Sequence, residues 1–246
     1  MKPILEVCAG SVQSVLAARE GGAARVELCS ALEVGGITPS MGLIAEARKI
    51  REITLNVLIR PRGGDFLYNE SEIRCMEQDI AIARQLGADG VVIGALTAQG
   101  NIDMECCRRL IDAAGDMSVT FHRAFDMCRE PFAALEEIIS LGCHRILTSG
   151  QAPTAMQGVP LIRQLVEAAE ERIIIMPGCG VNAHNATAIL DQTSAKEIHA
   201  SARSLVNSKM EYRHEGVTMG NKENDEYAHM ESDATLIRKI VEAIRG

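Results

Sequence analysis

The chain has 246 residues, 47% hydrophobic and 24% charged, which is the balance of a folded globular protein rather than a disordered one. Its formal net charge of −8 argues against nucleic acid or an anionic membrane as the main partner, because both attract basic surfaces. No apolar run approaches the roughly 18 residues of a membrane span, and no targeting segment is recognisable. The eight cysteines lack zinc-finger spacing, so we expect reduced thiols in a cytoplasmic protein.

A repeated phrase, Gly-Ala-x-x-apolar-x-apolar, organises the chain. It begins at Gly22 and Gly87, at Gly142 with Cys in place of Ala, and in a weaker copy at Ser194. In each copy a helical pattern ends, a small residue turns the chain and a short apolar strand follows. Glycine suits the turn because the residue after a helix C-terminus is often left-handed.

The repeat predicts eight strands, near residues 3–8, 24–29, 54–60, 89–94, 117–122, 144–149, 172–177 and 196–200. Helical patterns lie between them, and Thr38-Pro39 has the composition of an N-cap followed by a first-turn proline. The third helix has an apolar face made of Ile73, Met76, Ile80 and Ala83. The last helix, about 233–245, carries Leu236, Ile237, Ile240 and Ile244.

Eight strands alternating with helices predict an α/β fold, a single-domain (β/α)8 TIM barrel over residues 1–246. An open, doubly wound sheet is the alternative. No Gly-x-Gly-x-x-Gly follows the first strand, which weakens that alternative and argues against a nucleotide cofactor.

Polar residues gather at the C-terminal ends of the predicted strands, where the loops of a barrel build its active site. The stretches "LEVCAG" and "VELCSA" each place a Glu and a Cys on one face of a strand, because side chains alternate along it. The candidates are Glu6, Cys8, Glu27, Cys29, Arg60, Arg62, Asp65, His122, Arg123, Asp126, Ser149, Gly150, Gly178, Gly180, His199, Ser201 and Arg203. The opposite strand ends show no comparable concentration.

Three interpretations of these residues stay open. In the first, Arg60 and Arg62 neutralise Glu6 and Glu27, and the thiols are small core residues. In the second, the chain is a lyase or isomerase for a small anion such as a sugar phosphate or carboxylate. In the third, a hard divalent ion is held by a set of carboxylates and imidazoles. The residues of that set are Glu6, Glu27, His122 and His199.

The enzyme interpretation makes Glu6, Glu27, His122, Asp126 and His199 the catalytic candidates. Glu6 or Glu27 is the general base, and His122 or Asp126 is its acid partner. The anion is held by arginines and by glycine-rich turns whose backbone amides favour phosphate. These anion-binding candidates are Arg60, Arg62, Asp65, Arg123, Ser149, Gly150, Gly178, Gly180, Ser201 and Arg203. No lysine lies at a C-terminal strand end, so a Schiff-base aldolase mechanism is not expected.

The motifs "GGAARVELCSALEVGGITPS", "IRPRGGDFLY", "VTFHRAFDM", "RILTSG" and "MPGCGV" together resemble the CutC family of copper homeostasis proteins over nearly the whole chain. The resemblance implies a cytoplasmic barrel that forms a homo-oligomer, a dimer or tetramer, and that binds Cu(I). On the matched positions it implies Cys8 and Cys29 as the metal ligands. Thiolates are the ligands that Cu(I) prefers.

A polar stretch over residues 204–232 follows the eighth strand. A connection of this length on the functional face of a barrel is typical of a lid or a segment that lines the site. An interface with another chain is the alternative.

Overall fold

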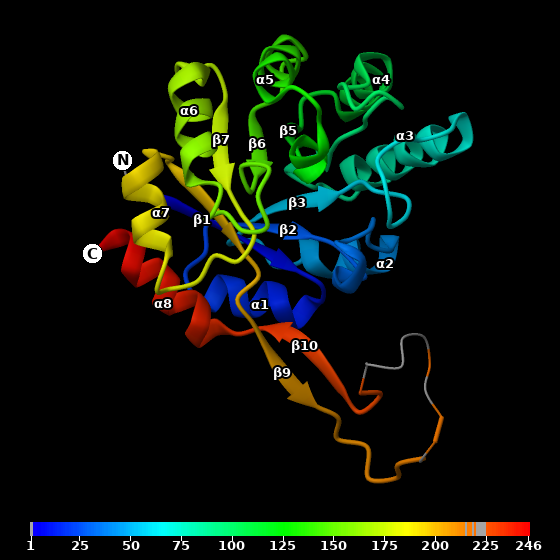
Figure 1. Cartoon of the computed structure of the whole chain (residues 1–246). Coiled ribbons are helices and arrows are strands. Elements are labelled where there is room, and N and C mark those ends of the chain that lie inside the picture. The colour runs from blue at the N-terminus through cyan, green and yellow to red at the C-terminus, as the bar shows by residue number, and fades with distance from the viewer. Residues whose placement is uncertain (1, 215, 218, 220–224) are drawn as a thin grey trace.

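The computed structural model describes residues 2–214, 216, 217, 219 and 225–246, and eight parallel strands form its centre (Figure 1). The strands are β1 (Ile4–Ala9), β2 (Arg25–Leu28), β3 (Thr54–Leu58), β4 (Gly90–Ile93), β5 (Ser118–Phe121), β6 (Arg145–Thr148), β7 (Ile174–Pro177) and β8 (Glu197–Ala200). Their hydrogen-bonded order is β7-β6-β5-β4-β3-β2-β1-β8, and β7 lies against β8 to complete the ring. The predicted (β/α)8 barrel is confirmed, and every predicted strand overlaps an observed one.

Helices surround the barrel and cover the outward faces of the strands (Figure 1). They are α1 (Val12–Glu20), α2 (Met41–Arg48), α3 (Glu70–Gln85), α4 (Met104–Ala114), α5 (Pro131–Ser140), α6 (Val159–Ala169), α7 (Ala186–Thr193) and α8 (Ala234–Arg245). Two short 3-10 helices, η1 (Leu32–Val34) and η2 (Arg123–Met127), follow β2 and β5. Among the described residues, no helix combines the length and apolar character that a membrane crossing needs.

The repeated glycines make the turns that the sequence predicted. Gly22, Gly87 and Gly142 have φ values of +84°, +82° and +81°, a conformation that a Cβ atom disfavours. Ser194, which begins the weaker copy, adopts φ +60° despite its side chain. The same helix-to-strand turn therefore recurs at all four copies.

One detail of the helices differs from expectation, and one is confirmed. Ser40, and not Thr38, caps α2: its hydroxyl accepts a hydrogen bond from the amide of Leu43. The Thr38 hydroxyl is engaged elsewhere, since it accepts from the Arg60 amide. On α8, Leu236 lies outside the buried face. The predicted apolar face of α3 is buried as expected.

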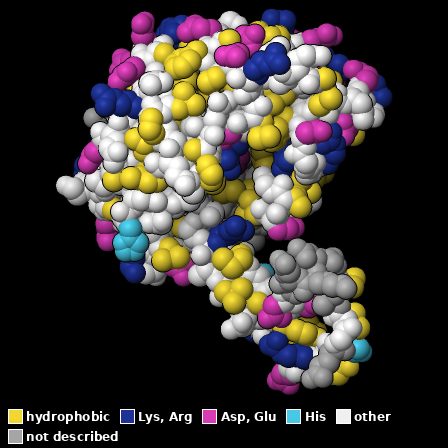
Figure 2. Space-filling view, in the orientation of Figure 1, with side chains coloured by type: hydrophobic (Ala, Val, Ile, Leu, Met, Phe, Trp, Pro, Cys, Tyr) yellow, Lys and Arg dark blue, Asp and Glu magenta, His cyan; other side chains and the backbone are white. Residues whose placement is uncertain are grey.

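A two-stranded arm follows β8. It consists of β9 (Arg203–Asn207) and β10 (Ala228–Ser232), paired antiparallel, together with the described residues between them, and its far end stands off from the barrel (Figures 1 and 2). Part of the segment 204–232 is thus a hairpin beside the barrel rather than irregular loop; residues 215, 218 and 220–224 lie outside the described residues. The arm exposes large apolar side chains at Leu205, Met210, Tyr212, Val217, Met219 and Met230.

Candidate metal centre

Side chains from alternate strands fill the barrel in layers, as is usual for this fold. Odd-numbered strands contribute one layer, formed by Glu6, Asn56, Thr120 and Met176. Even-numbered strands contribute the next layer toward the C-terminal ends, formed by Glu27, Val92, Leu147 and His199. The next layer, nearest the barrel mouth, contains Cys8, Leu58 and His122. In these three layers the ionisable side chains other than His122 come from β1, β2 and β8, and β4, β6 and β7 contribute apolar side chains.

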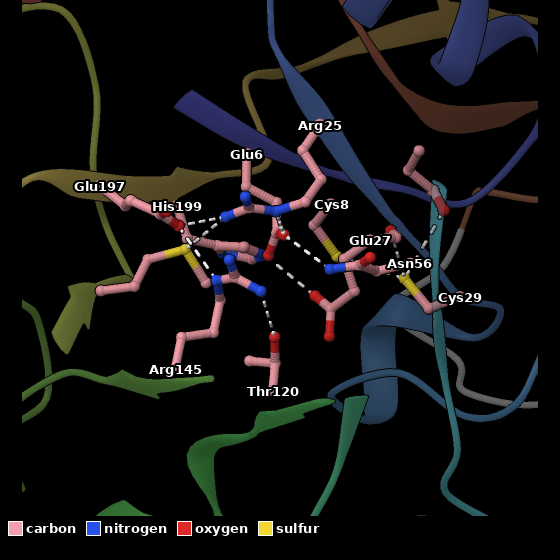
Figure 3. A network of polar contacts seen from close by, with 12 residues as sticks. Glu6, Cys8, Arg25, Glu27, Cys29, Asn56, Thr120, Arg145, Glu197 and His199 are labelled. Carbon is pink, nitrogen blue, oxygen red and sulfur yellow. Dashed lines mark hydrogen bonds and ion pairs between the residues drawn. The ribbon is translucent and has the colours of Figure 1, made fainter. Parts of the chain in front are cut away.

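A buried ion cluster lies at the N-terminal side of these layers (Figure 3). The Arg25 guanidinium donates hydrogen bonds to Glu6 and to Glu197, and Arg145 Nε donates to Glu197 Oε2 over 3.1 Å. Two carboxylates and two guanidinium groups balance in charge. Pairing of this kind is what makes burial of ionised groups tolerable.

Sequence reasoning missed this cluster, and the expectation that the N-terminal strand ends carry no comparable polar residues was wrong. Arg25, Arg145 and Glu197 each begin a strand. Asn56 was also missed, and its Nδ2 donates to Glu6 Oε2 over 3.3 Å. The available signal was strand alternation, which places each of them on the same face as an inward-facing residue farther along its strand.

Glu27 and His199 form a second pair, one layer closer to the barrel mouth (Figure 3). His199 Nε2 lies 2.8 Å from Glu27 Oε2 and 3.8 Å from Glu6 Oε1. Burial alone lowers the pKa of His199, but hydrogen bonding to Cys8 and Glu27 and the Glu27 charge raise it well above its usual value. The pair therefore favours an imidazolium facing a carboxylate.

The two thiols lie in contact above this pair. Cys8 Sγ and Cys29 Sγ are 3.2 Å apart, and both side chains are buried against Leu58, Val92 and Leu32. The hydrogen bond with Cys29 and burial raise the pKa of the Cys8 thiol well above its usual value. Cys8 is therefore a thiol at neutral pH, and an ion that binds it must displace its proton.

One cluster among the described residues has the spacing of a metal site. The ligand atoms of Cys8, Glu27 and His199 all lie within 4.8 Å of one another. Cys29 adds a second sulfur through its contact with Cys8. Thiolate and imidazole ligands suit soft and borderline ions such as Cu(I), so this donor set fits copper. His122, which belonged to the hard-ion set, is outside the cluster.

Arg60 does not neutralise the carboxylates of β1 and β2. Its guanidinium donates to the backbone carbonyls of Val34, Gly36 and Gly64, at 2.9, 2.9 and 2.7 Å. Arg25 and His199 pair with Glu6 and Glu27 instead, so the expectation that Arg60 and Arg62 do so was wrong.

Arg62 and Asp65 pair with each other in the loop that follows β3. The Arg62 guanidinium donates to Asp65 Oδ1 over 3.0 Å and to Glu72 Oε1 over 2.6 Å. These contacts fix the loop onto the start of α3. They leave the Arg62 charge already neutralised.

Asp126 lies in η2 after β5, and its carboxylate reaches the turn after β6. Its carboxylate accepts hydrogen bonds from the amides of Ser149 and Gln151 and from the Thr148 hydroxyl. Arg123 Nε donates to the same carboxylate over 2.7 Å. The Gly150 amide bonds to the Thr148 hydroxyl. A carboxylate of the chain itself therefore fills the anion-binding position that was expected for a substrate.

His122 lies at the C-terminal end of β5 with its ring buried. Its Nδ1 accepts a hydrogen bond from the Ala124 amide over 3.1 Å, and its ring packs 5.0 Å from that of Phe66, centroid to centroid. Burial, and then the charge of Arg60, lower the pKa of His122 to about 3. His122 is therefore neutral at physiological pH, which suits a hydrogen-bond donor better than a proton-transfer acid.

The last predicted candidates surround the ends of β7 and β8. Gly178 packs against Leu147 and His199, and Gly180 adopts φ +73°. Ser201 follows β8 directly, and Arg203 begins the arm. Arg203 lines an open groove of roughly 680 Å³ between the arm and the loops after β1 and β2.

Comparisons with known proteins consistently match the chain to CutC proteins. The model of the CutC family matches residues 3–204, so most of the arm and α8 lie beyond the matched segment. A CutC family protein of Parabacteroides distasonis is 53% identical over 243 residues, which is 98% of this chain and the whole of that protein. The copper homeostasis protein cutC homolog of Mus musculus is 47% identical over 238 residues, covering 96% of this chain and 88% of that protein.

A solved structure agrees with these matches. The crystal structure of a CutC protein from Streptococcus agalactiae superposes with a TM-score of 0.78 at 37% identity. The alignment covers 81% of this chain and 98% of that chain.

Proposed function

Because the chain belongs to the CutC family, we propose that it serves copper homeostasis by binding Cu(I) through the thiols of Cys8 and Cys29. The observation that carries the proposal is the 3.2 Å contact between the two sulfurs. Buried thiols separated by 21 residues of chain are brought together by the pairing of β1 with β2. Two adjacent sulfurs are a soft ligand pair, which is the chemistry that Cu(I) prefers.

The residues below the sulfurs support the same site. The ligand atoms of His199, Glu27 and Cys8 lie within 4.8 Å of one another, so either His199 or Glu27 is placed to complete the coordination. With metal–sulfur bonds of roughly 2.3 Å, a linear arrangement needs sulfurs roughly 4.6 Å apart. The thiols must therefore separate for such an ion, or a third ligand must accommodate a bent one.

The test is an anaerobic Cu(I) titration of the reduced protein against a chromophoric chelator. The variant Cys8→Ala with Cys29→Ala removes the proposed ligands. Its matched control, Cys106→Ala with Cys107→Ala, removes two equally buried thiols on α4. We expect one tight equivalent in the wild type and the control and none in the first variant. Equal Cu(I) affinity of all three proteins contradicts the proposal.

Acid–base catalysis on a small anion is a second candidate, favoured by the buried Glu27–His199 pair below the barrel mouth. A carboxylate beside an imidazole is suited to proton transfer in a lyase or isomerase reaction. A screen of small phosphorylated and carboxylated compounds, with Glu27→Gln as the inactive comparison, tests it. Turnover that survives Glu27→Gln counts against this pair.

We also propose that the protein works in a reducing, cytoplasmic environment. All eight cysteines are free, including the contacting pair Cys8 and Cys29, and none is held in a disulfide. An oxidising compartment would favour their cross-linking. A fusion to a compartment-specific fluorescent reporter tests this location, and export of the fusion contradicts it.

The arm supports self-association as a dimer or tetramer. Its exposed side chains include Leu205, Tyr212 and Met230, which is a large apolar content for a hairpin whose far end stands off from the barrel (Figure 2). Replacing residues 208–227 by Asn-Gly joins β9 to β10 through a short turn. Light scattering should then show a smaller assembly than the wild type forms. A wild-type monomer contradicts the proposal.

A further inference from the structure

Polar atoms without partners gather around the end of β3 and its following loop. Six buried side-chain polar atoms in the described part of the chain have no hydrogen-bond partner. Two of them, Arg60 Nε and the Tyr68 hydroxyl, belong to the segment 60–68. A third, His122 Nε2, belongs to a ring that packs against Phe66 of that segment. Since buried polar groups are nearly always paired, this concentration calls for an explanation.

The charge of Arg60 is the first part of that explanation. The described chain buries four arginines: Arg25, Arg48, Arg60 and Arg145. The other three each bond to a carboxylate of Glu6, Asp89 or Glu197. Arg60 alone bonds only to backbone carbonyls, so a full positive charge lies buried without an anion against it.

All three unpartnered atoms are donors at neutral pH. Because His122 Nδ1 accepts from the Ala124 amide, the ring proton resides on Nε2, which then donates. Burial raises the pKa of Tyr68 to about 12 against the opposing charges of Arg60 and Arg62, so its hydroxyl keeps its proton. A buried charge with adjacent donors suits an acceptor that carries negative charge.

Phe66 brings Arg60 and His122 together, and the Arg60 charge also acts on the Tyr68 hydroxyl. The ring of Phe66 lies 5.0 Å from the Arg60 guanidinium and 5.0 Å from the His122 ring. The Phe66 ring is only partly buried, so part of it reaches solvent beside these donors. A water molecule could satisfy the donors, but it would leave the Arg60 charge unbalanced.

We propose that Arg60, Tyr68 and His122 form a binding site for a small organic anion, bordered by Phe66. The carboxylate or phosphate group of the ligand pairs with Arg60 and Tyr68, and a second acceptor oxygen of the ligand reaches His122 Nε2. The site is separate from the thiols and requires no metal. If the second candidate function is correct, this site defines its substrate class. The site does not depend on that function, and it remains a proposal if the protein only binds copper.

The test uses the copper-free, full-length protein and three probes: inorganic phosphate, acetate and pyruvate, which adds a keto oxygen to acetate. Binding is followed by NMR at constant ionic strength through the side-chain resonances of Arg60 and His122. Tyr68→Phe removes one donor and preserves the ring. Its matched control is Tyr227→Phe, which removes a hydroxyl on the arm.

We expect at least one anion to bind, and Tyr68→Phe to weaken it roughly tenfold while Tyr227→Phe leaves it unchanged. Phosphate binding alone identifies a phosphorylated ligand, and acetate binding identifies a carboxylate. The two tyrosine variants binding equally, or no probe binding, overturns the site.

The role of His122 is tested separately with His122→Asn, which preserves an acceptor for the Ala124 amide. Pyruvate should bind the wild type several-fold more tightly than acetate does, and this preference should vanish in the variant. A preference that survives, or that is absent from the wild type, removes His122 from the site. Unchanged thermal melting of Tyr68→Phe shows that its effect is local.

Discussion

Glu6 and Arg25 face each other as register partners on β1 and β2, and their side chains form an ion pair inside the barrel. Arg25 also bonds to Glu197 on β8, so one guanidinium links the first, second and last strands. Replacing Arg25 by Met removes the guanidinium that both carboxylates share, and it leaves Glu6 with the neutral Asn56 amide as its remaining hydrogen-bond donor and Glu197 with Arg145. We expect the free energy of unfolding to fall by about 3–5 kcal/mol, measured by urea denaturation.

The control for Arg25→Met is Arg163→Met, which breaks an exposed pair with Glu167 on α6. That change should cost less than about 1 kcal/mol, because exposed ion pairs contribute little. Adding Glu6→Gln to Arg25→Met should restore part of the lost stability. Equal losses in the two single variants would show that the buried cluster has no special role.

Gly94 provides a prediction about packing at the barrel mouth. A Cβ atom at this position would lie 2.5 Å from the His122 ring, so the ring must shift to admit it. Gly94→Ala should destabilise the protein by about 1–3 kcal/mol. Gly42→Ala is the control, because its Cβ meets nothing closer than 3.9 Å on α2. That change should stabilise the helix by about 0.5–1 kcal/mol. Thermal melting of both variants checks the opposite signs.

The barrel and the inward direction of Glu6, Cys8, Glu27 and Cys29 follow from local signals. Strand alternation and the repeated glycine turn depend only on neighbouring residues, and both are visible in the sequence. The cross-barrel partner of each carboxylate is not a local property. Closure of the ring brings His199 on β8 beside β1, and only then does it meet Glu27.

Asp126 shows a second limit of sequence reasoning. Its place at the end of β5 indicated a catalytic acid, and the turn after β6 indicated an anion site. Neither pattern indicates that the carboxylate reaches across to that turn and accepts its amides. The sequence therefore predicted a catalytic acid and an anion site separately, although the Asp126 carboxylate is itself bound by the amides of that turn.

Asp126→Asn tests the structural role of this contact. The amide retains one acceptor oxygen, but it loses the charge that Arg123 and the Ser149 and Gln151 amides face. We expect a loss of about 2 kcal/mol and faster hydrogen exchange at Ser149 and Gln151. Asp65→Asn, in an exposed pair with Arg62, should leave both measurements nearly unchanged. Unaltered exchange in Asp126→Asn contradicts the assignment.

His122 makes stability depend on pH in a defined direction. Its pKa of about 3 in the folded protein lies below the value of roughly 6.5 expected for an unfolded chain. As the pH falls below about 6.5, the unfolded chain binds a proton that the folded protein excludes, so the free energy of unfolding decreases until about pH 3. His122→Asn removes this titration and preserves the acceptor for the Ala124 amide.

Urea denaturation at pH 7 and pH 5 measures the effect, because titrations common to both proteins cancel in the comparison. Between these pH values the wild type should lose about 2 kcal/mol more stability than His122→Asn. The sign follows from burial of a neutral ring beside the Arg60 charge, since both disfavour protonation in the folded state. Parallel losses in the two proteins would mean that the folded barrel tolerates a protonated His122, and the ring would then not be confined to the donor form.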